Sequence, residues 1–322
     1  MKPPYQITHK SLALISSISE KIGEIKAARL IKPPTELRKR NRIKTIQSSL
    51  EIEGNTLTVE QITDIINNKR VIAPGKDIVE VKNAIKVYSM LDDLDVYQVD
   101  SLCEAHGILM EGLIDQPGQL RRKSVGILKG GDISHIAPPG SMVLALMNDL
   151  FSYLKEDDDL LLVKSCVFHY EFEFIHPFLD GNGRMGRLWQ TMILKEYSPV
   201  FEFLPIETLI KERQQDYYHV LGTSDDKGES THFIEFMLEI IDVSLEELLN
   251  AQNLTLKNID RITIFKEIIK DQYFTRKEYL RHNKEISSAT ASRDLKEAVE
   301  NGILERSGDK RMTKYTYKLI GI

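Results

Sequence analysis

The sequence contains little cysteine and no long run of apolar residues. Its two cysteines, Cys103 and Cys166, lie in segments with helical spacing, without a CxxC pair or a Cys/His cluster suited to zinc. We expect both to be small buried side chains without a chemical role. No stretch reaches the ~18–20 apolar residues that cross a bilayer, and no cleavage pattern follows the N-terminal apolar patch. These absences exclude a membrane-spanning protein and predict a cytoplasmic location.

A strong overall charge is also absent. The 322 residues carry a formal net charge of −5, with 42% hydrophobic and 28% charged residues, which is ordinary for a globular protein. The charge is unevenly distributed, because residues 251–322 hold 15 Lys and Arg against 10 Asp and Glu, whereas the first 250 residues hold 28 against 38. The C-terminal part is therefore expected to be a separate unit in a chain of two or three domains.

Apolar spacing predicts a mainly α fold. Steps of three and four residues recur along most of the first 250 residues, and they are interrupted after residue 116 by a short alternating stretch around a Gly-Gly-Asp turn. This stretch predicts a small β-hairpin. Three helices followed by two short strands predict a winged helix-turn-helix at the C-terminus. We therefore divide the chain into an N-terminal helical region, a helical core and a winged helix, at residues 1–75, 76–250 and 251–322.

Chemistry-bearing residues are concentrated in residues 176–187, HPFLDGNGRMGR, which we call the signature segment. The glycines precede a helix with apolar residues on most faces, and the N–H groups at the start of a buried helix favour a phosphate. Arg184 and Arg187 are three apart, so both project from the first turns, and their guanidinium groups suit phosphate oxygens. Asp180 is placed to hold Mg²⁺, and His176 can accept a proton at neutral pH.

The signature segment resembles the HxFx[DE]GNGRxxR pattern of Fic-domain proteins at every specified position. The matching residues are His176, Phe178, Asp180, Gly181, Asn182, Gly183, Arg184 and Arg187. The resemblance implies a Fic-type helical bundle over about residues 76–250, with a β-hairpin flap. It also implies an enzyme that transfers AMP from ATP to a Ser, Thr or Tyr hydroxyl of a protein, which includes the enzyme itself among the candidate targets.

The resemblance also assigns roles to the residues. His176 would deprotonate the target hydroxyl, and Asp180 would hold Mg²⁺ on the α- and β-phosphates. Asn182 and the backbone N–H groups of residues 181–183 would stabilise the phosphates, and Arg184 and Arg187 would bind the β and γ groups. Phosphate-transferring Doc-like relatives have a lysine in place of Gly183, which favours AMP transfer for this chain. Further candidates are Val125, Gly126 and Ile127 for target docking and, more weakly, Asn83 and Tyr218 for adenine.

A second pattern lies upstream, in SLEIEG, residues 49–54, which we call the inhibitory segment. Ser49 and Glu53 are one helical turn apart, and Gly54 ends the helix. A carboxylate in a last turn opposes the helix dipole, so something outside the helix should favour it there. The segment is similar to the [ST]xxxE[GN] inhibitory motif of Fic proteins, whose glutamate pairs with the second arginine of the signature. The resemblance implies intramolecular inhibition by Glu53 on Arg187.

Two alternatives remain open from the sequence. The first is a DNA-binding regulator that senses ATP, in which Arg293, Lys296, Lys310 and Arg311 would contact phosphates. The second is a Fic enzyme that uses another nucleotide donor or removes AMP. The sequence does not identify the target protein, the modified residue or the signal that relieves inhibition. It also leaves open the base specificity, homodimer formation, and whether the winged helix binds DNA or protein.

Overall fold

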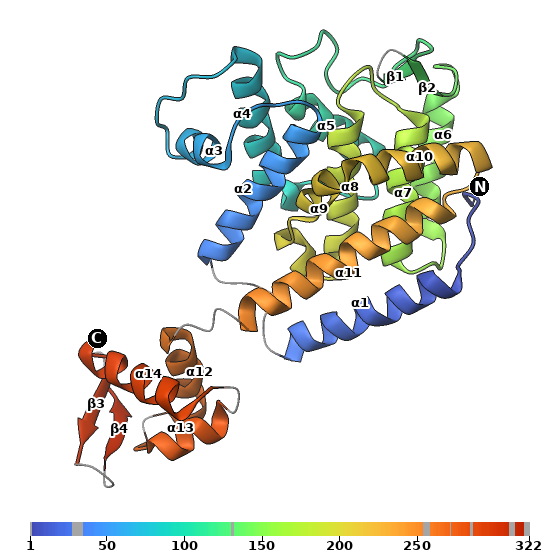
Figure 1. Cartoon of the computed structure of the whole chain (residues 1–322). Helices are drawn as coiled ribbons and strands as arrows, with labels where there is room; N and C mark the ends of the chain where they lie inside the picture. The colour runs from blue at the N-terminus through green and yellow to red at the C-terminus, as the bar shows by residue number, and fades with distance from the viewer. Residues whose placement is uncertain are drawn as a thin grey trace. The chain divides into compact units, whose positions relative to one another are not determined.

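A computed structural model describes residues 2–27, 35–129, 132–253, 258–270, 272–283, 286–308 and 313–318. The chain forms two compact units, Met1–Leu248 and Leu249–Ile322. Both are drawn in Figure 1. The mainly α fold predicted from the sequence is confirmed, since strands occur only as two short pairs in the described residues.

The first unit is an assembly of helices with one short hairpin at its edge (Figure 1). Before the hairpin lie α1 (His9–Ala27), α2 (Thr35–Ile52), α3 (Val59–Ile66), α4 (Gly75–Ser89), the 3-10 turn η1 (Leu91–Asp93) and α5 (Val99–Leu109). After it lie α6 (Val143–Glu156), α7 (Leu161–Ile175), α8 (Asn182–Tyr197), η2 (Pro199–Phe203), α9 (Ile206–Glu212), α10 (Gln214–Lys227) and α11 (Thr231–Asn253). Local sequence sets some of these boundaries: Thr58 and Gln61 form a capping box that starts α3.

Helix α8 occupies the centre of the first unit, and α7 packs along it. The sequence predicts a buried helix here, and residues 184–194 of α8 are all intermediate or buried, with Trp189 fully enclosed. The indole Nε1 of Trp189 donates to the carbonyl of Val96 at 3.0 Å, so the one polar atom of the ring is satisfied. Burial of such a side chain contributes roughly 2–3 kcal/mol, which fixes α8 as a rigid support for the residues at its N-terminus.

Helix α1 runs beside α11, and polar contacts join the two along their length (Figure 1). Ser17 donates to Asp242 at 2.7 Å, and Lys21 lies 2.9 Å from the same carboxylate. The apolar residues of α1 that face inward, Ile18, Ile22 and Ile25, are buried. Among the described residues, no helix has both the length and the apolar character needed to span a membrane.

The predicted hairpin is present as β1 (Gly126–Lys129) and β2 (Asp132–Ile136), which pair antiparallel. Gly126 lies opposite Ile136 and Ile127 opposite His135, and the register shifts between Ile127 and Leu128. Strand β2 contacts α10, whereas no other described strand pairs with β1. The outer edge of β1 is thus unpaired within the described part of the chain.

The second unit contains α12 (Asn258–Ile269), α13 (Arg276–His282), α14 (Ser288–Glu300), β3 (Leu304–Ser307) and β4 (Lys314–Tyr317). The strands pair antiparallel, and an apolar core centred on Phe265, Phe274 and Leu295 joins them to the helices. Three helices followed by two strands match the predicted order, while the winged-helix interpretation and its DNA partner stay predictions. Lys310 and Arg311 lie outside the described residues.

A buried ion pair in the second unit generates a stability prediction. Asp294 is 2% exposed and accepts from Arg261 Nε at 2.7 Å, from Arg261 Nη2 at 2.8 Å and from the Tyr279 hydroxyl at 3.1 Å. Asp294→Ala removes all three acceptors and should destabilise this unit by about 3 kcal/mol. Hydrogen–deuterium exchange of peptides from α12 and α14 would measure the loss.

The matched control is Glu300→Ala on the same helix. Its carboxylate is 60% exposed and pairs only loosely with Lys296, at 3.7 Å. This change should leave exchange in α12 and α14 close to that of the parent, since exposed pairs contribute ~0–1 kcal/mol. Equal protection in the Asp294→Ala and Glu300→Ala proteins would contradict the proposed importance of the Asp294 contacts.

Candidate functional site

The signature segment leads from the end of α7 into the start of α8. His176 is the C-terminal cap of α7 and has a left-handed backbone conformation, with φ 48° and ψ 61°. A residue with a side chain adopts this conformation at an energetic cost, which surrounding contacts must offset. The N–H of His176 donates to Phe172 at 2.9 Å, and its carbonyl accepts from Arg121 Nε at 2.7 Å. The predicted base therefore lies at a strained and firmly held turn.

Two interactions fix the loop between His176 and α8. The ring of Phe178 is buried and stacks on His106, with ring centres 3.6 Å apart and an interplanar angle of 4°. His106 Nδ1 accepts from the N–H of Gly118 at 2.8 Å, so its Nε2 carries the proton and donates to the carbonyl of Asp180 at 2.9 Å. Burial lowers the pKa of His106 to about 4, which keeps this ring neutral.

The side chain of Asn182 binds the backbone of the loop that precedes it. Its Oδ1 accepts from the N–H of Phe178 and its Nδ2 donates to the Phe178 carbonyl, both at 2.9 Å, and the residue is 2% exposed. The amide therefore closes the loop onto the start of α8. The expected contact of this side chain with phosphate stays a prediction.

The first turn of α8 is open to an anion. Gly181 precedes the helix with φ +83°, and no side chain caps the helix. A Cβ at Gly181 would meet Met110 Sδ at 2.7 Å, so only glycine fits both the backbone angle and the space. The N–H of Gly181 itself donates to Asp180 Oδ1 at 2.6 Å. The N–H groups that follow it in the helix give this end the partial positive charge that attracts phosphate.

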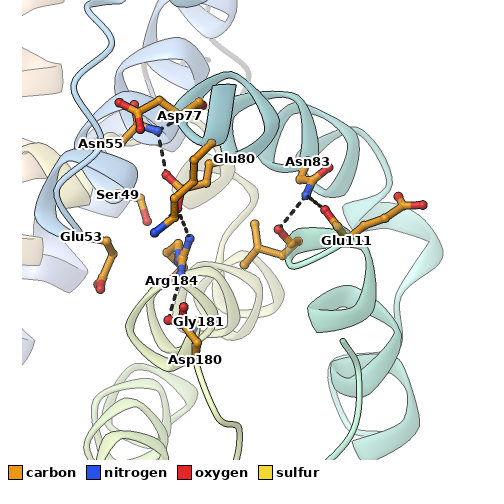
Figure 2. A network of polar contacts seen from close by, with 12 residues as sticks. Ser49, Glu53, Asn55, Asp77, Glu80, Asn83, Glu111, Asp180, Gly181 and Arg184 are labelled. Carbon is orange, nitrogen blue, oxygen red and sulfur yellow. Dashed lines mark hydrogen bonds and ion pairs between the residues drawn. The ribbon is translucent and has the colours of Figure 1, made fainter. Parts of the chain in front are cut away.

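Arg184 lies between two carboxylates, as Figure 2 shows. Its Nη1 donates to Glu80 Oε1 and its Nη2 to Asp180 Oδ1, both at 3.1 Å. The residue is 5% exposed, and its Nε is buried with no hydrogen-bond partner in the described part of the chain. A buried donor without an acceptor is costly, so an incoming anion that reached Nε would lower the energy of this site.

Arg187 is fully enclosed and binds the inhibitory segment. Its Nη2 donates to Glu53 Oε1 at 2.7 Å and to the carbonyl of Ser49 at 2.9 Å, and its Nε donates to Ser49 Oγ at 3.2 Å. The ion pair between Glu53 and Arg187 that the sequence predicts is therefore present. Helix α2 ends at Ile52, so Glu53 lies in the turn just beyond it, and Gly54 follows with φ +91°.

The Glu53 carboxylate also lies against the start of α8. A Cβ placed on Gly183 would overlap Glu53 Oε1 and lie 3.1 Å from Arg187 Nη1. The carboxylate therefore stands beside both the N-terminal turn of α8 and the second arginine of the signature segment. Glycine at 183 is needed for this approach. An acidic side chain thus occupies the part of the site that the positive helix end and Arg187 would offer to phosphate.

The residues of the site fit the predicted magnesium ion. The side chain of Asp180 is 53% exposed, and both of its hydrogen bonds in the site use Oδ1. The described residues contain no group of three or more acidic, His or Cys side chains that would hold a metal by themselves. Magnesium commonly binds through one carboxylate together with water and phosphate oxygens, so a single Asp beside a phosphate site suits this ion.

The adenine candidates lie in different surroundings. Asn83 on α4 is buried, and its Nδ2 donates to the carbonyls of Leu109 at 3.1 Å and Glu111 at 2.8 Å (Figure 2). These bonds support the end of α5. Tyr218 on α10 is half-buried, and burial, with the charge of Glu53 contributing, raises the pKa of its hydroxyl. Tyr218 therefore lies near the inhibitory pair, and the adenine role of both residues stays a prediction.

Sequence reasoning missed Arg121, which joins the hairpin to the signature segment. Its Nη1 donates to the carbonyl of Lys123 at 2.7 Å, and its Nη2 donates to those of Pro138 at 2.8 Å and Ile175 at 2.9 Å, in addition to the bond with His176. The residue is 3% exposed. In the sequence it is one of several cations before a predicted strand, so nothing distinguishes it. Its role depends on contacts across more than 50 residues.

Together, a strained histidine, an uncapped helix start and two buried arginines define a site for a phosphate-containing ligand. The Fic/DOC family profile matches residues 95–194, which include the whole signature segment. The chain is 39% identical to a Fic family protein from Desulfovibrio desulfuricans G20 whose crystal structure is known; the likeness covers 100% of both chains, with a TM-score of 0.76. The chain belongs to the Fic/DOC family.

More distant relatives share the core. The protein adenylyltransferase fic-1 of Caenorhabditis elegans is 26% identical over 230 residues, which is 66% of this chain and 42% of that protein. The protein adenylyltransferase Fic of Drosophila melanogaster is 28% identical over 248 residues, or 72% of this chain and 45% of that protein. The chain thus spans less than half the length of these relatives. The solved structure of C. elegans Fic-1 shares the fold, with a TM-score of 0.59, 19% identity and 76% coverage of each chain.

Two buried groups near the site, His106 and Glu207, are predicted to make the stability of the protein depend on pH in opposite directions. Burial lowers the pKa of His106 to about 4, below its ordinary 6.5. The stability that neutral His106 contributes is therefore present above pH 6.5 and is lost as the pH falls toward 4. Burial raises the pKa of Glu207, which is 1% exposed on α9, from 4.5 to about 7. Its contribution is present below pH 4.5 and is lost as the pH rises through 7.

We therefore expect His106→Asn and Glu207→Gln to change the free energy of unfolding with opposite pH trends. The stability advantage of the parent over His106→Asn should shrink by a few kcal/mol between pH 6.5 and 4.5, because the unfolded histidine takes up a proton. The advantage of the parent over Glu207→Gln should instead grow over the same fall in pH. Urea denaturation at several pH values measures both, and parallel trends would contradict the assignment of the two groups.

Proposed function

We propose that this protein is an adenylyltransferase that moves AMP from ATP to a Ser, Thr or Tyr hydroxyl of a protein, with release of pyrophosphate. The observation that carries the proposal is the anion site at the start of α8, where Arg184, Arg187 and the N-terminal N–H groups converge beside Asp180 and His176. The adenylyltransferase names of the C. elegans and Drosophila relatives support the same reaction.

In this reaction the residues of the site have separate tasks. His176 accepts the proton of the target hydroxyl, whose oxygen forms a new bond to the α-phosphorus, while the bond from that phosphorus to the leaving pyrophosphate breaks. The helix N-terminus, Arg184 and Arg187 stabilise negative charge on the phosphate oxygens. Magnesium held by Asp180 would neutralise further charge there when bound. The rigid turn at His176 would keep the base aligned with the hydroxyl.

The hairpin is proposed as the docking flap for the target. Strand β1 carries Gly126 and Ile127, Val125 directly precedes it, and β1 pairs with no described strand other than β2. An extended segment of a target protein can add to such an edge through main-chain hydrogen bonds, largely independently of its sequence. The bonds of Arg121 to the hairpin ends and to His176 support this proposal, since they tie the flap to the base.

We further propose that the inhibitory segment restrains this activity within the same chain. Glu53 binds Arg187 and lies beside Gly183, so its charge opposes a terminal phosphate at the same place. While this carboxylate is in place, ATP would have to bind with its phosphates in other positions. Its α-phosphorus would then not be aligned with the attacking target hydroxyl. Displacement of Glu53 would open the productive position.

The decisive experiment compares AMP transfer by purified variants with labelled ATP. Glu53→Gly should raise transfer at least about tenfold, which corresponds to about 1.4 kcal/mol of relieved competition. His176→Ala in the Glu53→Gly protein should lower it by a factor of roughly 10²–10⁴, the usual contribution of a general base. Mass spectrometry of the enzyme and of co-incubated proteins would detect the adenylyl group on a hydroxyl.

Glu51→Gly is the matched control for the inhibitory role. Glu51 lies two residues earlier and pairs with Lys211, 3.0 Å away, so the same substitution there removes a carboxylate that does not contact Arg187. Its transfer activity should stay at the level of the parent. Equal activity in the parent and in Glu53→Gly would remove the inhibitory role, while activity that survives His176→Ala would remove the base.

A separate prediction concerns the metal. In the Glu53→Gly background, Asp180→Ala should raise the Mg²⁺ concentration needed for half-maximal transfer by at least about tenfold, because one carboxylate is the main protein ligand. A Mg²⁺ titration at fixed ATP measures this concentration, and Asp149→Ala on the far helix α6 serves as a control. An unchanged titration curve for Asp180→Ala would show that the ion does not depend on this residue.

A further inference from the structure

Glu80 on α4 contacts both Arg184 of the signature segment and Asn55, the residue directly after the inhibitory segment. Its Oε1 accepts from Arg184 Nη1 at 3.1 Å, and its Oε2 accepts from Asn55 Nδ2 at 2.8 Å. The side chain is 7% exposed, and a second cation, Lys76, lies 3.8 Å away and is largely exposed. Figure 2 shows Glu80 between Asn55 and Arg184.

Asn55 determines the course of the chain after Glu53. It is 5% exposed, its N–H donates to the carbonyl of Leu50 at 3.1 Å, and its Oδ1 accepts from the N–H of Leu57 at 3.1 Å. Its Nδ2 also donates to the carbonyl of Asp77 at 3.1 Å. These bonds hold the turn of residues 53–56, and this turn fixes where the Glu53 carboxylate stands.

Asp77 holds the same turn without touching the nucleotide residues. Its Oδ2 accepts from the N–H of Thr56 at 2.9 Å and from the Thr56 hydroxyl at 2.6 Å. Asp77 and Glu80 are three residues apart on α4, so both face the turn. Only Glu80 of the two also binds Arg184, which separates its role from that of a simple anchor.

We propose that Glu80 is a positioning residue that links the inhibitory segment to the nucleotide-binding arginine. One carboxylate orients Arg184 for phosphate and holds Asn55. The position of Glu53 and the binding site for the nucleotide therefore depend on the same side chain. The proposal rests on the function proposed above, because it takes Arg184 to bind the nucleotide. It adds a residue from outside both the signature segment and the inhibitory segment.

The physical basis of this proposal is that a buried carboxylate needs hydrogen-bond donors. Glu80 has little access to water, so each oxygen needs a strong donor, and Arg184 and Asn55 supply them. An amide at position 80 offers one acceptor atom and one donor group, so it cannot accept from both partners. Loss of the Glu80 carboxylate leaves Arg184 less well oriented for phosphate, so the nucleotide must order the guanidinium when it binds.

The test uses two measurements that require no AMP transfer. Hydrogen–deuterium exchange of a peptide covering residues 49–57 reports the turn, in proteins that retain Glu53. Isothermal titration calorimetry with ATP and Mg²⁺ reports nucleotide binding, in the Glu53→Gly background where the carboxylate does not compete. The variants are Glu80→Gln, Glu80→Ala and, as the matched control, Asp77→Ala.

For Glu80→Gln and Glu80→Ala we expect exchange of the 49–57 peptide to be at least about threefold faster and the Kd for ATP at least about threefold higher, as the loss of a charge-assisted hydrogen bond implies. Asp77→Ala should accelerate exchange of the same peptide and leave the Kd for ATP unchanged. Thermal unfolding and the emission of Trp189 would verify that each variant is folded, and Glu80→Gln preserves the shape of the site.

Three results would overturn the proposal. Unchanged exchange in both Glu80 variants removes the link to the inhibitory segment, and an unchanged Kd removes the link to Arg184. A raised Kd in Asp77→Ala equal to that of Glu80→Ala shows that any loosening of the turn weakens ATP binding, without a special role for Glu80. If the expected changes appear but the Glu53→Gly enzyme modifies no hydroxyl, adenylyl transfer fails as the function while the role of Glu80 stands.

Discussion

The site depends on the burial of two arginines at the N-terminal end of α8. Arg184 and Arg187 are 5% and 2% exposed, and the helix end adds further positive charge. Removing such charges from water costs several kcal/mol each unless anions or carbonyls stand close by. In this chain Asp180 and Glu80 accept hydrogen bonds from Arg184, while Ser49 and Glu53 accept them from Arg187. The acidic residues around α8 therefore follow from the need to hold the arginines before any nucleotide arrives.

This requirement gives Glu53 two effects at once. Its carboxylate satisfies a buried guanidinium, which favours the folded protein, and it fills the place that a phosphate would take. A site built to bind a polyanion is electrostatically incomplete when empty, so an internal anion is a natural way to complete it. Under the proposed function, stability of the resting protein and restraint of its chemistry would then arise from one ion pair, in which Arg187 is fully enclosed and Glu53 is 30% exposed. Glu53 is the more exposed partner, so it is the residue that can move away from Arg187.

Features that depend on neighbouring residues in the sequence could be predicted from it, whereas features that depend on distant contacts could not. The start of α8 and the hairpin were predictable from short contiguous patterns of residue types, whereas the Glu53–Arg187 pair was predicted from the resemblance of two contiguous segments to Fic motifs. The bonds of the Asn182 side chain to the backbone of Phe178 were not foreseen, because a pattern of residue types does not reveal a backbone partner four residues away. Glu80 and Arg121 were missed because their roles exist only after distant segments pack together.

Arg121 shows why such long-range contacts matter for the chemistry. His176 holds a left-handed backbone that is unfavourable for a residue with a Cβ, and the turn persists because its surroundings hold it. Part of that support is one guanidinium, whose other bonds go to Lys123 and Pro138 on the two sides of the hairpin. A displacement of the hairpin ends therefore acts on the same side chain that holds the carbonyl of His176. Arg121 thus joins the turn at His176, the proposed base, to the hairpin, the proposed flap, so one buried cation connects the two places where a target protein would have to fit under this proposal.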